Sequence, residues 1–165
     1  VTSRSPASAE ALVAHAHHLG LRASVVADPN LALAHCPLVV VCTPAQGVAL
    51  WAQPGPCHFV AAVGAFTPRM VELHPDVCRH VAQHGRVVVD TADAVHEAGD
   101  LLQAGLDVAR FPTLADVVAG RAGPKPNGPV LFKSCGWAGW DLAAARLVTS
   151  MGRDLGAAPA TPKFE

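Results

Sequence analysis

Three residues near the start of the sequence have side chains that suit the binding of an anion. Ser3, Arg4 and Ser5 combine one cation with two small hydroxyl donors, and a guanidinium carries forked donors that match phosphate oxygens. Ser5 followed by Pro6 is typical of a helix N-terminus, where backbone N–H groups favour negative charge. Taken alone, an exposed arginine in a strand-to-helix turn is the simpler interpretation.

The other candidate residues follow apolar stretches that we expect to be strands. The stretches 37–42, 58–64, 86–90 and 129–134 are rich in β-branched residues, and strands that are apolar on both faces are typical of buried parallel sheets. Ligands bind such sheets at the carboxyl ends of the strands. The residues expected there are Ser3, Arg4 and Ser5; Thr43, Pro44 and Ala45; Gly64, Ala65 and Phe66; Asp90 and Thr91; and Ser134 and Cys135.

The elements that must position these residues alternate between strand and helix. Helices are expected at residues 6–20, 28–35, 69–85, 91–106, 114–120 and 137–152, with a turn-like break at 98–99. A further short apolar stretch, 22–26, follows the first helix, and 123–129 reads as a loop. The alternation predicts an α/β fold with a doubly wound, Rossmann-like parallel sheet.

One part of a dinucleotide-binding sheet is missing from the sequence. Such a sheet needs a first strand and a glycine-rich turn, G-x-G-x-x-G or G-x-G-x-x-A, and neither occurs here. The residue after the second strand of such a sheet meets the adenosine ribose, where an arginine suits a 2′-phosphate and an acid suits a 2′-hydroxyl. Val1 and Thr2 therefore read as the end of a second strand, with the first strand and glycine loop upstream of Val1.

Composition excludes several classes of protein. The chain has 165 residues, 51% of them hydrophobic and 15% charged, which indicates one ordered domain with a sizeable core. A formal net charge of −1 favours neither nucleic acid nor an anionic membrane as a partner, and no apolar run is long enough to span a bilayer. With no visible signal peptide and five scattered cysteines, we expect reduced thiols and a cytoplasmic location.

Several stretches together resemble one enzyme family. They are VTSRS, PLVVVCTPA, FVAAVGAFTPRMVEL, RVVVDTADAVHEAGDL, LADVVAG and VLFKSCGWAGWDLAAARLV. From Val1 to about Val148, their order and spacing resemble the second half of the ornithine cyclodeaminase/mu-crystallin family. The resemblance implies a homodimeric NAD(P)-dependent enzyme, with residues 1–150 as a partial Rossmann-like domain. Residues 151–165 would be a C-terminal tail that returns to a separate substrate-binding and dimerisation domain, largely absent here.

The resemblance also implies cofactor-binding positions, with NADP(H) preferred and NAD(H) as the alternative. The matched positions are Ser3, Arg4 and Ser5 for the 2′-phosphate; Thr43 and Ala45 for the adenosine and ribose side; Val63, Gly64 and Ala65 for the turn beside the nicotinamide ribose; and Ser134 near the nicotinamide ring. The family's residues that grip a substrate carboxylate would lie upstream of Val1. The resemblance therefore assigns no catalytic residue within this sequence.

One departure from the family pattern bears on the reaction. Ornithine cyclodeaminases carry an aspartate two residues after the glycine that matches Gly64, and this sequence has Phe66 there. A phenyl ring cannot accept a proton or pair with an ammonium group, so the resemblance favours the reductases that convert cyclic imines such as Δ1-pyrroline-2-carboxylate with NAD(P)H. The alternatives are an ornithine cyclodeaminase, which converts L-ornithine to L-proline and ammonia, and a non-enzymatic protein that binds NADPH and a small ligand.

The remaining polar residues have simpler interpretations. His15 and His18, and His80 and His84, have helical spacings, but no HExxH pattern or ligand set accompanies them. We therefore expect surface histidines and no metal. Three acids, Asp90, Asp100 and Asp141, are expected in structural roles such as helix capping, and Cys135, which has no evident activating His or Lys neighbour, is expected to be inert.

Overall fold

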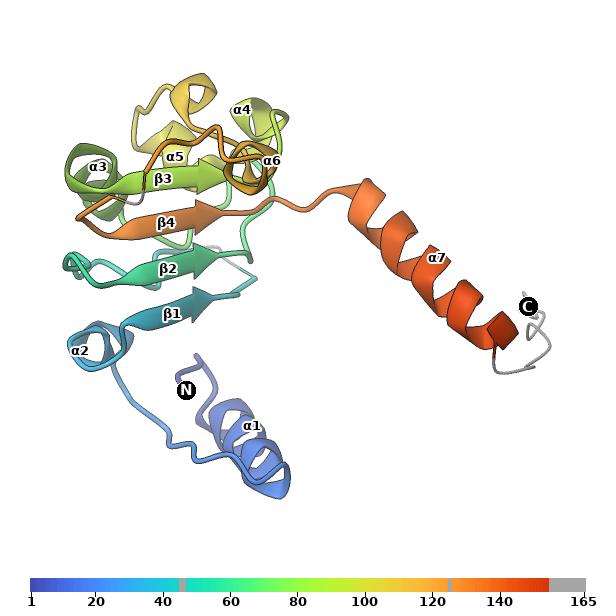
Figure 1. Cartoon of the computed structure of the whole chain (residues 1–165). Helices are drawn as coiled ribbons and strands as arrows, with labels where there is room; N and C mark the ends of the chain where they lie inside the picture. The colour runs from blue at the N-terminus through green and yellow to red at the C-terminus, as the bar shows by residue number, and fades with distance from the viewer. Residues whose placement is uncertain (45–46, 125, 155–165) are drawn as a thin grey trace. The chain divides into compact units, whose positions relative to one another are not determined.

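Four short runs of apolar residues pair as parallel strands. The computed structural model describes residues 1–44, 47–124 and 126–154, with side chains as far as Gly152. The strands are β1 (Leu38–Val41), β2 (Phe59–Ala62), β3 (Arg86–Val89) and β4 (Val130–Lys133). Their order in the sheet is β1-β2-β4-β3, with every neighbouring pair parallel (Figure 1). This confirms the predicted α/β class with a parallel sheet.

Seven α-helices are formed by the described residues. They are α1 (Pro6–His18), α2 (Pro29–Leu33), α3 (Pro75–His84), α4 (Ala94–Glu97), α5 (Gly99–Gln103), α6 (Leu114–Val118) and α7 (Ala138–Asp154), with a short 3-10 helix at Val108–Arg110. The chain divides into two compact units, the first from Val1 to Cys135 and the second beginning at Gly136. No helix of the described residues has both the length and the apolar character needed to cross a bilayer.

Local chemistry explains where the helices begin. Ser5 caps α1 as predicted, since its side chain accepts a hydrogen bond from the Ser8 N–H, and Pro6 occupies the first helical turn. Asp28 caps α2 in the same way. Thr113 and Asp116 form a reciprocal capping box at α6. These caps satisfy backbone donors that the first turn of a helix leaves without an intrahelical partner.

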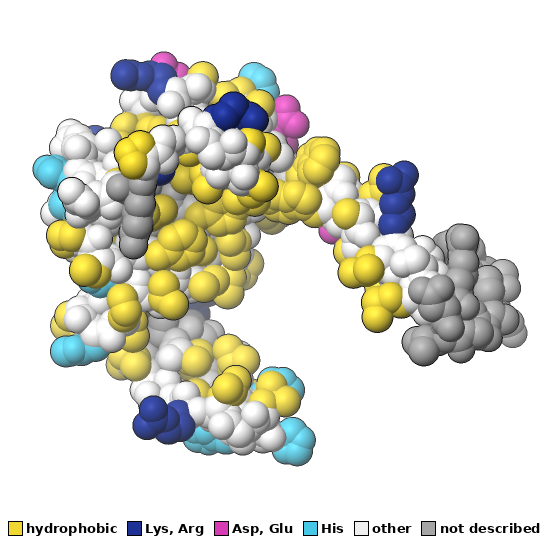
Figure 2. Space-filling view, viewed as in Figure 1, with side chains coloured by type: hydrophobic (Ala, Val, Ile, Leu, Met, Phe, Trp, Pro, Cys, Tyr) yellow, Lys and Arg dark blue, Asp and Glu magenta, His cyan; other side chains and the backbone are white. Residues whose placement is uncertain are grey.

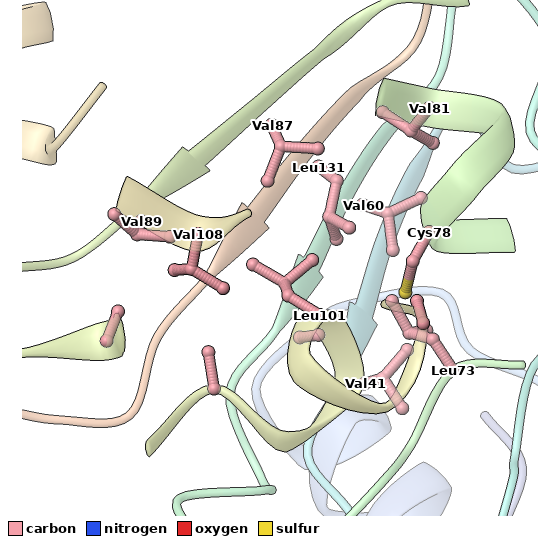
Figure 3. Packing of buried hydrophobic residues seen from close by; sticks show 14 of the residues in the cluster. Val41, Val60, Leu73, Cys78, Val81, Val87, Val89, Leu101, Val108 and Leu131 are labelled. Atoms are coloured by element: carbon pink, nitrogen blue, oxygen red, sulfur yellow. The ribbon is translucent and has the colours of Figure 1, made fainter. Parts of the chain in front are cut away.

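The core lies on one face of the sheet. Val60 of β2 and Leu131 of β4 are fully buried and pair in register, with Val87 of β3 beside them. Figure 3 shows these side chains gathered with Val81 of α3 and Leu101 of α5. Because side chains alternate along a strand, Lys133 projects from the same buried face as Leu131. Its ammonium group must therefore find its partners inside the protein.

Strand β1 departs from the prediction of strands buried on both sides, whereas Ala61 of β2 and Val88 of β3 are buried on the same face as its exposed residues. In β1, Leu38 is 76% exposed and Val40 is 68% exposed, and only Val41 is buried. Phe59 of β2 is also exposed, and Figure 2 shows hydrophobic side chains gathered over the sheet. β1 has a strand partner only on its β2 side among the described residues. Its composition therefore suits a more enclosed position than the one it occupies here.

Two of the expected helices are shorter than the sequence suggested. The helix expected at 69–85 begins only at Pro75. The residue before a proline rarely adopts helical backbone angles, and the N–H groups of Glu72 and Leu73 donate to Asp100 instead of to a helix. The helix expected at 91–106 is split into α4 and α5 at the predicted break. A Cβ at Gly99 would lie 2.1 Å from the Met70 carbonyl oxygen, so this close approach requires glycine.

The N-terminal segment behaves as the end of a strand without being assigned as one. The amino group of Val1 donates to the Ser24 carbonyl at 2.8 Å, and the Val26 N–H donates to the Val1 carbonyl at 2.8 Å. These two bonds have the pattern of one parallel β-pair. The short apolar stretch at 22–26 thus pairs with the first residue of the chain, as a neighbouring strand would.

Truncating the core of the central strand should test this packing. We expect Leu131→Ala to lower the free energy of unfolding by about 2–5 kcal/mol, because it leaves a cavity where Leu131 is fully buried. The matched control is Leu31→Ala in α2, since Leu31 is 71% exposed and its removal should cost far less. Urea denaturation of both variants measures the difference, and equal losses would contradict the described core.

Candidate functional site

A cavity of about 590 Å³ joins two groups of residues that the sequence assigned to cofactor binding. The N-terminal segment contributes Ser3, Arg4 and Ser5 to its lining, and the end of β1 contributes Thr43 with Pro44. The rest of the lining is mostly apolar and includes Leu12, Val26, Leu33, Val39 and Val41. Ala45, the other position predicted for the adenosine and ribose side, lies outside the described residues.

The N-terminal part of this lining combines an arginine with two serines at the start of α1. Ser5 lies at the N-terminus of α1, and its N–H donates to Ser3 Oγ at 3.3 Å. Arg4 is exposed, and no described residue binds its guanidinium by a hydrogen bond or an ion pair. A helix N-terminus with a neighbouring arginine is an electrostatically favourable place for an anion. Ser3, Arg4 and Ser5 all line the cavity, and their assignment to a 2′-phosphate remains a prediction.

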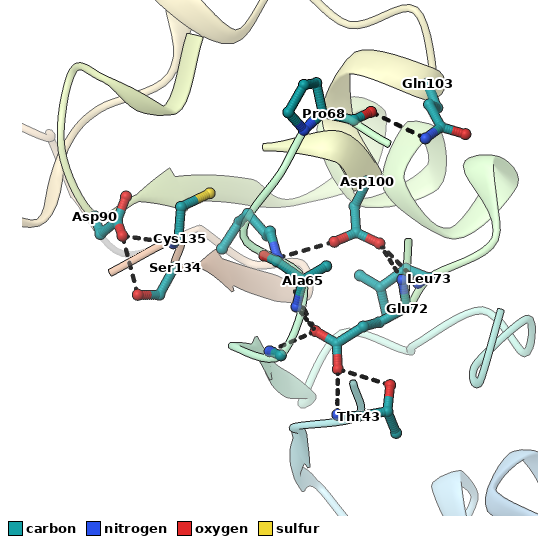
Figure 4. Close-up of polar contacts among 12 residues, drawn as sticks. Thr43, Ala65, Pro68, Glu72, Leu73, Asp90, Asp100, Gln103, Ser134 and Cys135 are labelled. Carbon is teal, nitrogen blue, oxygen red and sulfur yellow. Dashed lines mark hydrogen bonds and ion pairs between the residues drawn. The ribbon is translucent and has the colours of Figure 1, made fainter. Parts of the chain in front are cut away.

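A buried glutamate, Glu72, holds the ends of β1 and β2 (Figure 4). Its Oε1 accepts hydrogen bonds from the Thr43 N–H at 2.6 Å and from the Thr43 hydroxyl at 3.0 Å. Its Oε2 accepts from the N–H groups of Gly64 at 2.7 Å and Ala65 at 3.0 Å. A Cβ at Gly64 would lie 2.2 Å from the Thr43 carbonyl oxygen, so glycine allows the two strand ends to come this close.

Lys133, at the end of β4, and Asp100, at the start of α5, complete this cluster. Lys133 Nζ lies 3.0 Å from Asp100 Oδ2 and 4.0 Å from Glu72 Oε2, and all three side chains are buried. Lys133 Nζ also donates to the Ala65 carbonyl oxygen. Asp100 Oδ1 accepts from the backbone N–H groups of Glu72 and Leu73. Asp100 therefore has the predicted structural role, and it fixes the backbone that carries Glu72.

A second buried carboxylate holds the ends of β3 and β4. Asp90 Oδ2 accepts from the Ser134 hydroxyl at 3.0 Å and from the Cys135 N–H at 2.6 Å (Figure 4). Its Oδ1 accepts from the Thr91 N–H at 2.8 Å. The predicted structural role of Asp90 agrees with this geometry, but capping of the next helix does not. The residue at the N-cap of α4 is Asp93, and Asp90 instead connects neighbouring strands.

The turn after β2 presents the remaining predicted positions unequally. Val63 is 41% exposed and Phe66 is 57% exposed, so both offer apolar surface. Ala65 is fully buried, and its N–H and carbonyl groups are bound by Glu72 and Lys133. Ser134 is also buried, with its hydroxyl on Asp90. The assignment of Val63, Gly64, Ala65 and Ser134 to a cofactor remains a prediction, and Val63 is the most exposed of these four residues.

Sequence analysis did not single out Glu72 or Lys133, although both are central to this site. The available signal was a single charge inside an apolar stretch, in VEL and in VLFKS. A lysine or glutamate within a buried segment needs a partner, because an unpaired charge in the interior is very costly. The signal indicates that partners exist, but it does not identify them, since they come from other parts of the chain.

The cysteines and histidines give little support for further chemistry. Burial raises the pKa of the Cys135 thiol to about 11 and that of Cys78 to about 12, which disfavours the thiolate needed for nucleophilic attack. The rings of His80 and His84 lie 4.6 Å apart. Across residues 1–44, 47–124 and 126–152, no three His, Cys, Asp or Glu side chains are grouped to hold a metal ion.

The parallel sheet, with polar groups at its carboxyl end, defines an α/β domain of the type that binds ligands at the ends of its strands. Residues 1–154 match the model of the ornithine cyclodeaminase/mu-crystallin family, and the chain belongs to this family. The described sheet and the family match therefore confirm the resemblance that the sequence motifs carried.

Individual relatives agree with this assignment. The chain is 49% identical over 90 residues to Delta(1)-pyrroline-2-carboxylate reductase 2 of Burkholderia ambifaria. These 90 residues are 54% of this chain and 27% of that protein. It is 36% identical over 99 residues to the ketimine reductase mu-crystallin of Mus musculus. These 99 residues are 59% of this chain and 29% of that protein.

A solved structure shows the same fold. It is the Thermococcus litoralis Delta(1)-pyrroline-2-carboxylate reductase in complex with NADH and L-proline, with a TM-score of 0.84 and 21% identity. The match covers 98% of this chain and 52% of that one. The chain thus spans about half the length of this relative.

Removing the buried cation should destabilise the protein strongly. We expect Lys133→Met to lower the free energy of unfolding by about 3–5 kcal/mol, because it leaves two buried acidic side chains without their cation. The control is Arg121→Met, which breaks an exposed ion pair with Asp116 and should change stability much less. Urea denaturation compares the two, and similar small losses would show that Lys133 is not needed by the cluster.

Proposed function

We propose that the protein is an NAD(P)H-dependent reductase of cyclic imines, with Δ1-pyrroline-2-carboxylate as the representative substrate. The proposal is supported by membership of the family and by the 49% identity to a relative named for this reaction. Because the chain spans only part of its relatives, the activity is proposed for the protein that contains it. We also propose that the protein forms a homodimer and that it is cytoplasmic. All five cysteines are free, which agrees with a reducing compartment.

The residues present fit a dinucleotide cofactor, with NADPH preferred over NADH. The exposed Arg4 guanidinium and the donors at the N-terminus of α1 suit a 2′-phosphate. Thr43, at the end of β1, lines the same cavity and suits the ribose side. Val63, in the turn after β2, offers apolar surface for the nicotinamide end.

The cavity also suggests where the rest of the cofactor site lies. Most of its polar residues follow strand ends or lie at the start of α1, whereas the residues of β1 that line it are apolar. We propose that one more strand pairs with β1 in the apolar part, between β1 and Val1, which is bonded to Ser24 and Val26, and that its following glycine-rich turn meets the pyrophosphate. Such a strand would pair with the backbone edge of β1 that has no strand partner among the described residues.

The observation that carries the choice of reaction is the exposed side chain of Phe66. It is 57% exposed in the turn after β2, so it can contact a ligand at this edge of the sheet. A phenyl ring provides apolar contact for a ring substrate but cannot take a proton from an amine. The bound cofactor would supply a hydride to the imine carbon. In this chain the residues bind and orient the reactants.

The direct test is the oxidation of NADPH and NADH by Δ1-pyrroline-2-carboxylate, followed with the protein including any chain that precedes this sequence. We expect turnover with both cofactors and a lower KM for NADPH. Release of ammonia from L-ornithine, without imine reduction, would instead establish the cyclodeaminase alternative. Tight NADPH binding without turnover of any cyclic imine would favour the non-enzymatic alternative.

The variant Arg4→Ala tests the cofactor preference in the same assay. We expect it to raise the KM for NADPH by about tenfold or more while leaving the KM for NADH nearly unchanged, because only NADPH carries the 2′-phosphate. Arg22→Ala is the matched control, since Arg22 is also exposed but does not line the cavity. Equal increases for both cofactors would contradict the assignment of Arg4.

A further inference from the structure

We infer that the buried cluster of Glu72, Asp100 and Lys133 gives the turn after β2 a preference for a positively charged reactant, so that the cyclic imine reacts as its protonated iminium. This inference rests on the proposed function and deepens it, because it names the charge state of the substrate. The cluster acts on the ligand through its electric field and does not touch it.

The first step is the formal charge of the cluster. Both oxygens of Glu72 accept hydrogen bonds from N–H groups, and Asp100 Oδ1 accepts from two more. An ionised carboxylate has only acceptor sites, so this set of donors fits both acids in their charged form. Lys133 supplies one ammonium group, 3.0 Å from Asp100 and 4.0 Å from Glu72. Two carboxylates and one ammonium group leave one negative charge in excess.

The titratable neighbours on α3 do not cancel this excess. Arg79 is exposed and binds Asp76 at 2.6 Å and the Ala104 carbonyl oxygen at 3.0 Å. Cys78 is buried beside the cluster, and burial raises the pKa of its thiol to about 12, so it stays uncharged. No other Lys or Arg of the described residues forms an ion pair with either acid of the cluster.

The second step places the excess charge directly behind an exposed turn. Glu72 binds the N–H groups of Gly64 and Ala65 (Figure 4), and the residues on either side of them, Val63 and Phe66, are exposed. One layer of backbone therefore separates the carboxylate from the surface of the turn. Because the peptide bonds are trans, the carbonyl oxygens of Val63 and Gly64 lie on the side away from Glu72. Both these dipoles and the buried charge, which salt screens little, favour a cation outside the turn.

The third step follows the charges through the reaction. The imine carbon receives a hydride, with its electron pair, from the dihydronicotinamide ring, and the electrons of the C=N double bond move to nitrogen. Starting from an iminium, this gives a neutral amine and a cationic nicotinamide ring, so one positive charge is present before and after the transfer. Starting from a neutral imine, it gives an anionic nitrogen, which the excess negative charge would oppose. A fixed negative charge therefore suits the iminium throughout hydride transfer.

The test compares NADP⁺ with NADPH, which differ by one positive charge on the nicotinamide ring. Their dissociation constants are measured without any imine, with the protein including any chain that precedes this sequence. We expect Glu72→Gln and Asp100→Asn, which each remove one negative charge, to weaken NADP⁺ at least about threefold more than NADPH. A loosened turn alone would weaken both nucleotides equally, and the two variants break different hydrogen bonds. The control is Asp116→Asn, which removes a carboxylate paired with Arg121 outside the cluster and should leave the ratio unchanged.

A second pair of probes tests the charge at the substrate. L-Proline carries an ammonium group in its ring, whereas pyrrole-2-carboxylate has the same ring size and carboxylate but an uncharged nitrogen. We expect both cluster variants to weaken binding of L-proline to the NADPH complex more than binding of pyrrole-2-carboxylate.

An unchanged ratio of NADP⁺ to NADPH affinity in either cluster variant would overturn the preference for a cation. An unchanged ratio for the two ring acids would overturn the assignment of the iminium form. Nucleotide binding without imine turnover removes only the proposed reaction, whereas failure of the unsubstituted protein to bind either nucleotide overturns both.

Discussion

The buried ammonium group of Lys133 is the interaction on which the organisation of the sheet's carboxyl end depends. It lies 3.0 Å from Asp100 and 4.0 Å from Glu72, with all three side chains removed from solvent. Burial of such groups is costly, so a cluster of this kind persists only when each member has partners. Those partners include the backbone of Thr43, Gly64 and Ala65.

The same principle extends across the sheet. Glu72 connects the ends of β1 and β2, Lys133 connects β4 to the turn after β2, and Asp90 connects β3 to β4. The residues after parallel strands carry the ligand chemistry of this fold, yet such turns are mobile unless something holds them. Buried charged groups therefore position the turns, while the exposed side chains Phe66 and Arg4 remain available for contact.

The sequence predicted the features that depend on local patterns. The cap at Ser5, the four central strands and the break before Gly99 follow from nearby residues, and the structure confirms them. It did not predict the exposure of β1, because an apolar run reports what a strand can bury and not what covers it. Nor did it predict the polar cluster, since Glu72 reaches Thr43 across 29 positions and a sequence pattern does not reveal such pairings.

The most direct test of this account is hydrogen exchange at the backbone amides of Thr43, Gly64 and Ala65 in the native protein. All three lie in turns outside the strands, where amides commonly exchange fast. If Glu72 binds them as described, they should exchange slowly, with protection comparable to that of the neighbouring strand residue Val60. Glu72→Gln should then reduce that protection selectively. Rapid exchange at all three amides in the unsubstituted protein would contradict their hydrogen bonds to Glu72, and with them the proposed arrangement of the cofactor site.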